Sequence, residues 1–398
     1  MLYHVLPGLS DVHMVFNVFR YLTFRAAGAV VTSLLIAFVF GPMVIRRLRR
    51  ANVGQVVRDV GPAAHLAKAG TPTMGGVLII LAASVSTLLW ADLTNVYIRI
   101  ALVALLWMGA IGFLDDYLKV VQGKTKGLIA RYKMVGQWTF GLGLGAFLIL
   151  NPISPHPSTA TSVPFFSDVQ ANFIPFAFVL FSGFVVSGTS NAVNFTDGLD
   201  GLAAGVAAII AATLAFLAAQ AGEIFGACVG VAMVGALLGF LPFNFSPARI
   251  FLGDTGALFI GYVLALLALE GYRQLTILTF VVPVFALAVP ILDTTLSVIR
   301  RLRARSRIFD ADRLHMHHRM LESEGSARSA VLQVYILTAA FCSISLAFSN
   351  LAGYMALLFL VAVGILTYRL ITNLGALAAV VDPAASRESS LNSGDNEP

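Results

Sequence analysis

The most informative residues in this chain are six aspartates that stand near the ends of long apolar runs. They are Asp115, Asp116, Asp197, Asp200, Asp254 and Asp293. Ionised side chains at the edge of an apolar environment are costly unless they are paired or bind a metal. Any one of them is explained equally well as a helix cap or as the partner of an arginine. A set of six favours one shared site.

The residues around these aspartates are suited to phosphate and metal chemistry. Carboxylates with lysines nearby, and without cysteines, are typical of sites where Mg²⁺ or Mn²⁺ bridges a phosphorylated substrate. The string NAVNFTDGLDGLAAG (191–205) is polar and glycine-rich before it becomes apolar, so it offers amides and a helix N-terminus to an anion. Gly253, Asp254, Thr255 and Gly256 repeat this chemistry further along. The sequence therefore predicts a site for a divalent cation and a phosphate.

Three histidines, His315, His317 and His318, lie in the string DADRLHMHHRM (310–320), within the most basic segment of the chain. The spacing would suit Zn²⁺, but no cysteine or fixed fourth ligand accompanies it. A solvated basic loop is the plain structural alternative. We interpret the histidines as cationic and hydrogen-bonding groups for a sugar or a diphosphate.

The composition shows which kind of scaffold must position these residues. The chain is 58% hydrophobic and only 12% charged, whereas a soluble domain is about 25% charged. This excludes a soluble enzyme, a disordered protein and a fibrous repeat, and it indicates a polytopic membrane protein. The net charge of +6 is then loop charge that orients the chain in the bilayer, and it does not imply a nucleic-acid partner.

A helix that crosses a bilayer needs about 20 apolar residues, and we predict an all-α fold with 10–11 such spans. With the N-terminus outside, all but four of the 26 Lys and Arg residues fall on the inner side. The positive-inside rule therefore predicts that the aspartates and histidines lie at the cytoplasmic face. The candidate spans are 22–45, 74–91, 97–114, 134–151, 173–190, 199–219, 224–243, 255–269, 274–298, 331–348 and 351–371.

We interpret residues 1–380 as a single membrane-embedded domain and residues 381–398 as a polar, disordered tail. A transporter or flippase is the alternative from another class, but it would place its acids at mid-membrane. An inactive membrane scaffold is a second alternative, and it would have lost the acid and histidine sets. The acids at one face favour an enzyme.

Several strings resemble the polyprenyl-phosphate N-acetylhexosamine-1-phosphate transferases, a family of the glycosyltransferase 4 type, and the resemblance covers nearly all of residues 15–370. The N-terminal half is most similar to the branch that uses UDP-MurNAc-pentapeptide. The histidine segment and the two apolar runs after it are similar to branches that transfer N-acetylglucosamine-1-phosphate. The matching strings are FNVFRYLTFRA (16–26), GQVVRDVGP (54–62), KAGTPTMGG (68–76), GFLDDYLKVVQGKTKGLIARYK (112–133), NAVNFTDGLDGLA (191–203) and PARIFLGDTGALFIGY (247–262).

The resemblance implies transfer of phospho-MurNAc-pentapeptide from UDP-MurNAc-pentapeptide to undecaprenyl phosphate, which gives lipid I for peptidoglycan synthesis and releases UMP. The alternative is transfer of N-acetylglucosamine-1-phosphate from UDP-GlcNAc to a polyprenyl phosphate for other envelope glycans. Mg²⁺, or alternatively Mn²⁺, would be the cofactor. The bacterial plasma membrane would be the location, and the sequence leaves open whether the chain is a monomer or a homodimer.

The resemblance also implies roles for individual residues. Asp254 would be a metal ligand, with Asp115, Asp116 and Asp197 as further metal-site carboxylates. Asp115 would be a base, a positioning group or a covalent nucleophile, while His317 and His318 would bind the sugar or its phosphate during catalysis. Phe251 would stack on uracil. The full set of expected substrate-binding residues is Lys68, Thr73, Lys119, Lys133, Asn191, Asn194, Asp197, Asp200, Asn244, Phe251 and His315.

Overall fold

The computed structural model gives the arrangement of most of the chain. Lys68, the three histidines of 315–318 and the tail 381–398 lie outside the described residues, so their predicted roles and states stay predictions. The described residues are 1–51, 70–124, 127–151, 160–162, 170–172, 174–271, 281–303, 320–321, 325–349 and 353–373.

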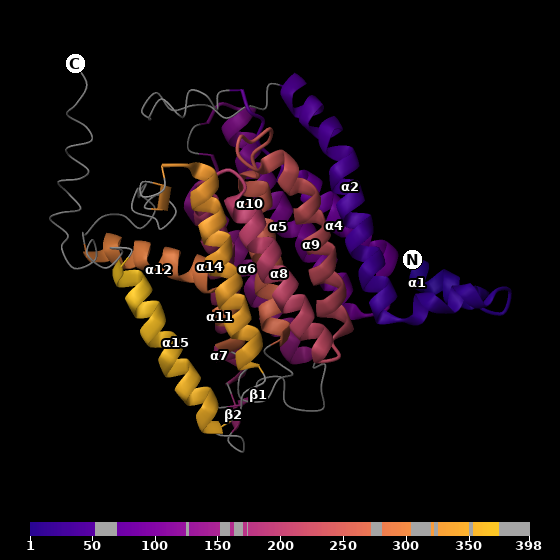
Figure 1. Cartoon of the computed structure of the whole chain (residues 1–398). Coiled ribbons are helices and arrows are strands. Elements are labelled where there is room, and N and C mark those ends of the chain that lie inside the picture. Colours follow the sequence, from indigo (N-terminus) through magenta and orange to yellow (C-terminus); the bar gives the residue numbers. More distant parts are fainter. Residues whose placement is uncertain are drawn as a thin grey trace.

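The described chain is a bundle of long helices (Figure 1). Two three-residue strands, β1 (Ala160–Ser162) and β2 (Gln170–Asn172), pair antiparallel with Thr161 opposite Ala171. The helices are α1 (Leu2–Val5), η1 (Leu6–Leu9), η2 (Met14–Arg20), α2 (Leu22–Arg50), α4 (Gly76–Trp90), α5 (Val96–Val120), α6 (Ala130–Leu150), α7 (Pro175–Thr196), α8 (Leu202–Gln220), α9 (Ile224–Asn244), α10 (Gly253–Gly271), α11 (Val281–Ala286), α12 (Ala288–Arg303), α14 (Ala327–Phe348) and α15 (Gly353–Asn373).

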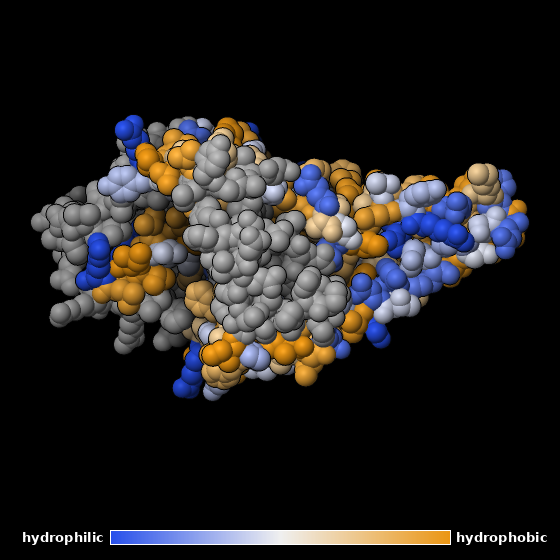
Figure 2. All heavy atoms as spheres, turned by 90° about the horizontal axis from the view of Figure 1, so that it is seen from below, coloured by the Kyte–Doolittle hydropathy of each residue, from blue (hydrophilic) through white to orange (hydrophobic). Residues whose placement is uncertain are grey.

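Seven helices of the described chain, α2, α5, α6, α7, α8, α9 and α14, are long and apolar enough to cross a membrane. Shorter apolar helices lie in α4, α10 and α15. Seen from below, many of the side chains around the edge of the bundle are apolar, while the arm formed by α1, η1 and η2 projects to the right and mixes hydrophilic and hydrophobic residues (Figure 2). The prediction of an all-α, multi-pass membrane protein is confirmed.

The prediction of one span over 274–298 is wrong, because two helices, α11 and α12, occupy its described part. Pro290 has no N–H to give to the carbonyl of Ala286, so a continuous helix loses a hydrogen bond there. The Cys342 thiol approaches that carbonyl instead, with 3.8 Å between Sγ and O. After the break, α12 runs across the direction of its neighbours (Figure 1).

Three glycines bring α4, α5 and α10 into close contact. A Cβ on Gly76 would lie 2.1 Å from the backbone nitrogen of Gly256, and a Cβ on Gly112 would lie 2.4 Å from the carbonyl oxygen of Asp254. Small residues allow helices in a membrane to approach at backbone distance. This approach carries the C-terminal end of α5 to the first turn of α10, although the two are far apart in sequence.

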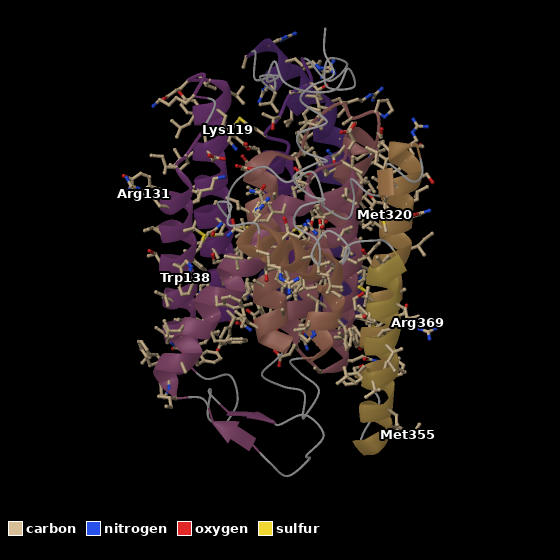
Figure 3. The ribbon with its side chains drawn as sticks, turned by 90° about the vertical axis from the view of Figure 1, so that its left-hand side faces the viewer. Lys119, Arg131, Trp138, Met320, Met355 and Arg369 are labelled. Atoms are coloured by element: carbon tan, nitrogen blue, oxygen red, sulfur yellow. The ribbon has the colours of Figure 1, made fainter. Side chains whose placement is uncertain are left out.

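The polar end of α5 lies at one end of the bundle. Figure 3 shows Lys119 near that end, while Met355 and the strands lie at the opposite end. The structure therefore places the predicted site close to one boundary of the apolar bundle. Its assignment to the cytoplasmic face remains a prediction from the charge pattern.

Candidate active site

Three carboxylates from two helices form a compact group. Asp115 and Asp116 lie near the end of α5, and Asp254 is the second residue of α10. One oxygen from each side chain lies within 4.8 Å of the others. Asp115 is fully buried, Asp116 is 3% exposed, and the Asp254 side chain is 14% exposed. Three acids in so little water require compensating positive charge.

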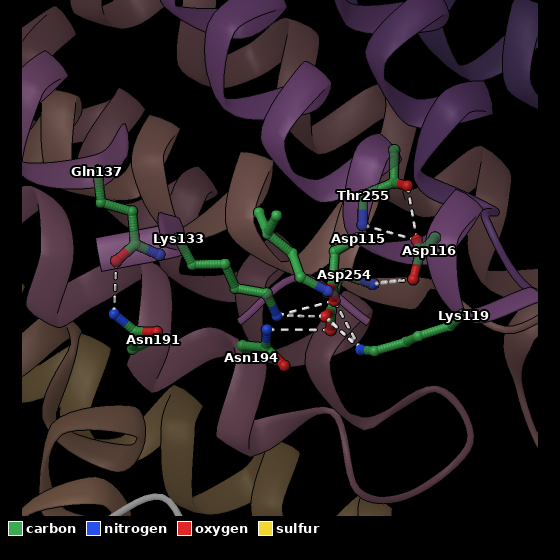
Figure 4. A network of polar contacts seen from close by, with 10 residues as sticks. Asp115, Asp116, Lys119, Lys133, Gln137, Asn191, Asn194, Asp254 and Thr255 are labelled. Carbon is green, nitrogen blue, oxygen red and sulfur yellow. Dashed lines mark hydrogen bonds and ion pairs between the residues drawn. The ribbon is translucent and has the colours of Figure 1, made fainter. Parts of the chain in front are cut away.

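Two lysines supply that charge (Figure 4). The Lys119 ammonium lies 2.6 Å from Asp115 Oδ2 and 2.7 Å from Asp254 Oδ2. The Lys133 ammonium, which comes from α6, lies 2.8 Å and 2.6 Å from the same two oxygens. Two ammonium groups leave three carboxylates with one uncompensated negative charge. A bound cation can therefore replace an ammonium group at the carboxylates, and a bound phosphate can replace a carboxylate at the lysines.

Asp116 has a different environment from its neighbour, because it caps the N-terminus of α10. Its Oδ1 accepts a hydrogen bond from the Asp254 backbone N–H at 3.1 Å. Its Oδ2 accepts from the Thr255 backbone N–H at 2.9 Å and from the Thr255 hydroxyl at 2.6 Å. A carboxylate at this position satisfies unpaired N–H groups and interacts favourably with the helix dipole. Asp116 thereby fixes the position of Asp254.

Gly253 makes this cap sterically feasible. Its φ of +74° is in the left-handed region, which glycine adopts without strain. An added Cβ would lie 2.5 Å from Asp116 Oδ2 and 2.9 Å from Thr73 Oγ1. Thr73, which was expected to bind substrate, therefore lies beside the carboxylate group. The next residue, Met74, is buried and has a φ of +72° although it is not a glycine, so the backbone there is strained.

The turn after α5 returns to Asp115. The Leu128 backbone N–H donates to Asp115 Oδ1 at 2.6 Å. Gly127, with a φ of +58°, passes so close that an added Cβ would lie 2.5 Å from the same oxygen. One oxygen of Asp115 is thus held by the backbone, while the other contacts the lysines.

The two predicted asparagines of α7 have different surroundings. Asn194 donates from Nδ2 to Asp254 Oδ1 at 3.1 Å, so it belongs to the carboxylate group. Asn191 lies one turn away and donates to Gln137 Oε1 at 2.8 Å, and Ser187 donates to the same oxygen at 3.1 Å. Figure 4 shows the Gln137–Asn191 pair apart from the lysine–carboxylate network. The structure therefore engages Asn191 with α6 rather than with the acids.

The other predicted residues lie in two loops that contact each other. Loop A (197–201) joins α7 to α8, and loop B (245–252) joins α9 to α10. The Ala248 backbone N–H donates to Asp200 Oδ2 at 3.2 Å, which links the two loops. Asn244, at the end of α9, donates to the Ile250 carbonyl at 3.0 Å. These bonds define the shape of loop B.

Loop B is also bound to the segment that carries Thr73. The Phe251 backbone N–H donates to the Pro72 carbonyl at 2.8 Å, and its carbonyl accepts from the Gly75 N–H at 2.9 Å. The predicted stacking residue Phe251 therefore has a fixed backbone. Apart from Asn191, the described polar residues that the sequence marked are thus divided between the carboxylate group and loops A and B with the adjoining Asn244.

The carboxylate group can hold a divalent cation. Carboxylate oxygens are the ligands that Mg²⁺ and Mn²⁺ prefer, and Asp115, Asp116 and Asp254 form the metal-compatible group found among the described residues. Asp197, which was expected to join it, is not part of that group. The partners of Asp116 belong to the first turn of α10, whereas Oδ2 of Asp115 and of Asp254 contacts lysine side chains. A lysine side chain can move away from a carboxylate, so Asp115 and Asp254 are the better candidates to bind an ion.

Sequence reasoning missed Gln137 and underused Thr255. Gln137 is fully buried in α6 and lies four residues after Lys133, on the same face of the helix. An isolated polar residue of this kind in an apolar run was the available signal. Thr255 was assigned only a general role in anion binding, whereas its hydroxyl binds Asp116.

Comparisons of the sequence with known proteins identify its relatives. The model of glycosyl transferase family 4 matches residues 98–272, and the phospho-N-acetylmuramoyl-pentapeptide-transferase signature 1 matches residues 68–80. The chain is 41% identical over 362 residues to a phospho-N-acetylmuramoyl-pentapeptide-transferase of Endomicrobium trichonymphae, covering 86% of this chain and 99% of the relative. It is 40% identical to that of Gemmatimonas aurantiaca, covering 81% and 92%, and 42% identical to that of Citrifermentans bemidjiense, covering 85% and 96%.

Proposed function

Because this chain belongs to the phospho-N-acetylmuramoyl-pentapeptide transferases, we propose that it transfers phospho-MurNAc-pentapeptide from UDP-MurNAc-pentapeptide to undecaprenyl phosphate. The products are lipid I, which is used in peptidoglycan synthesis, and UMP. The observation that carries this proposal is the buried group of three aspartates, two of which, Asp115 and Asp254, are bridged by Lys119 and Lys133. The reaction takes place at the cytoplasmic face of the bacterial plasma membrane.

The chemistry requires two anions to meet. A phosphate oxygen of the acceptor attacks the β-phosphorus of the donor and forms a new P–O bond. The bond from that phosphorus to the oxygen bridging to the α-phosphate breaks, and UMP leaves with the bonding electrons. Neutralising charge on the transferring group is therefore the main catalytic need.

Lys119 and Lys133 meet part of this need. Each ammonium lies within 2.8 Å of the carboxylates, and each can reorient toward phosphate oxygens when substrates bind. The carboxylate oxygens that they leave become available to Mg²⁺, or to Mn²⁺. Asp254 and Asp115 would hold the ion, which supplies positive charge to the diphosphate.

Asp115 and Asp116 have distinct roles in this scheme. The acceptor phosphate, with a second pKa of about 6, is largely dianionic at pH 7, so it does not require a base. Asp115, whose Oδ1 is bound by the backbone of Leu128, positions the ion and the acceptor. Asp116 acts through α10, because its oxygens accept the N–H groups that place Asp254.

The nucleotide end of the donor is assigned to loops A and B. Asp197 and Asp200 lie in loop A, Asn244 adjoins loop B, and Phe251 offers a ring that can stack on uracil. The histidines of 315–318 bind the sugar or its phosphate. With the nucleotide and the sugar bound elsewhere, the carboxylate group and its lysines act on the phosphate that is transferred.

Purified protein with undecaprenyl phosphate and Mg²⁺ tests the proposal when it is offered UDP-MurNAc-pentapeptide or UDP-GlcNAc in parallel. We expect UMP release and a lipid-linked product with the first donor only. Release with UDP-GlcNAc alone would assign the enzyme to other envelope glycans. Absence of UMP with both donors would refute the transferase.

A further inference from the structure

Helix α14 contacts both loop A and loop B, the loops to which the nucleotide is assigned, although it contributes no residue to the carboxylate group. The Tyr335 hydroxyl donates to the carbonyl of Gly201 in loop A at 2.6 Å. The Arg328 Nε donates to the carbonyl of Ser246 in loop B at 2.9 Å. The two side chains are seven residues apart, which places them two turns apart on one face of α14. One helix face therefore holds both loops.

A glycine of α8, Gly205, makes room for the Tyr335 ring. An added Cβ on Gly205 would lie 2.0 Å from the Tyr335 hydroxyl oxygen, so this glycine provides the notch that admits the ring. Gly201, the acceptor of the hydrogen bond, has a φ of +85° and precedes the first residue of α8. The hydroxyl thus binds loop A at a turn that only a glycine adopts easily.

The same two loops also contact each other directly. Asp200 Oδ2 accepts from the Ala248 N–H at 3.2 Å, and a Cβ on Gly201 would lie 3.0 Å from the ring of Phe245. Among the described contacts, these and the two bonds from α14 link the positions of the two loops. A change in the separation of the loops moves Asp197 and Asp200 relative to Phe251.

We propose that Tyr335 and Arg328 are positioning residues for the UDP-sugar donor, because they fix the two loops to which its nucleotide is assigned. The inference rests on the proposed function and deepens it. It separates donor recognition, which depends on α14, from charge neutralisation by the carboxylate group. It predicts a kinetic effect that is specific to one of the two substrates.

The test compares Tyr335→Phe with the wild-type protein in the UMP-release assay, with each substrate varied in turn. Loss of one hydrogen bond is expected to raise the KM for the UDP-sugar about 3- to 10-fold. The kcat and the KM for undecaprenyl phosphate should stay within twofold. Arg328→Met should change the same parameter, and the double variant should raise it further.

Two further variants separate positioning from simple destabilisation. Ser343→Ala removes another hydroxyl of α14, which donates only to the Ala339 carbonyl of its own helix among the described contacts, and it should leave both KM values unchanged. Gly205→Ala displaces the Tyr335 ring without altering it, so it should reproduce the rise in donor KM. Thermal unfolding in detergent is measured for every variant.

An unchanged donor KM in Tyr335→Phe, or a fall in kcat that follows a loss of thermal stability, would overturn the inference while leaving the transferase intact. An equal rise in both KM values would overturn it as well. Wild-type protein that releases no UMP would overturn the proposed function, and this inference with it.

Discussion

Replacing Lys133 with methionine should change metal binding and substrate use in opposite directions. The Lys133 ammonium lies 2.8 Å from Asp115 Oδ2 and 2.6 Å from Asp254 Oδ2, and its side chain is 17% exposed. These are the oxygens that a divalent cation would use. The lysine therefore competes with the ion for Asp115 and Asp254, while it is needed to neutralise the phosphates.

The size of both effects follows from these contacts. A hydrogen bond to a charged group contributes about 1.5–3 kcal/mol, so loss of the ammonium should lower kcat/KM for the donor about 10- to 150-fold. The carboxylates would then share one ammonium, that of Lys119, instead of two. With less competition from lysine, the Mg²⁺ concentration that gives half-maximal activity should fall. We expect a fall of only about 5- to 10-fold, because partial solvent exposure weakens the interaction between Lys133 and the carboxylates.

The assay is UMP release over a Mg²⁺ titration, together with calorimetric Mg²⁺ binding to the purified protein without substrates. Lys124→Met is the matched control, because Lys124 is an exposed lysine of the connection between α5 and α6. It should leave both quantities unchanged. A Lys133→Met protein whose Mg²⁺ requirement stays the same or rises would refute the idea that lysine and ion compete for one pair of oxygens.

Three further changes test the remaining parts of the site. Asp254→Asn should abolish turnover at every Mg²⁺ concentration, and full activity in the UMP-release assay would eliminate Asp254 as a metal ligand. Gly253→Ala should lower kcat at least tenfold, because the added Cβ would lie 2.5 Å from Asp116 Oδ2. The φ of +74° at this position also costs an alanine about 1 kcal/mol or more. A wild-type kcat would show that the hydrogen bonds of Asp116 to α10 tolerate displacement. His317→Ala should weaken use of the UDP-sugar while undecaprenyl-phosphate binding stays nearly intact, and an equal loss of both would contradict a sugar-side role.

Much of the site could be predicted because its residues are conspicuous in an apolar chain. Asp115, Asp116 and Asp254 are ionisable groups at the ends of apolar runs, where their cost requires a function. Lys119 and Lys133 were expected to accompany them. The structure brings these five side chains together, and Asn194 and Thr73 lie with them.

The partners of several residues could not be predicted from the sequence. Asn191 faces Gln137, Asp200 accepts from Ala248, and Asp116 caps α10. Each partner lies on another helix or loop, and helices that are apolar on all sides carry no pattern that marks which face meets which neighbour. The break between α11 and α12 was missed because the run 274–298 is mostly apolar, although Pro290 was its visible signal.

The sequence by itself determined that the chain is a multi-pass membrane protein, that its cations gather on one predicted side, and which acidic residues were available there. These properties depend on composition and on position along the chain. Only the tertiary structure decided which acids share a site and what each one binds. Asp116 and Asp254 are 138 residues apart, and they meet because Gly76, Gly112 and Gly256 let three helices approach at backbone distance. That close packing is a property of side-chain volumes in contact across the bundle.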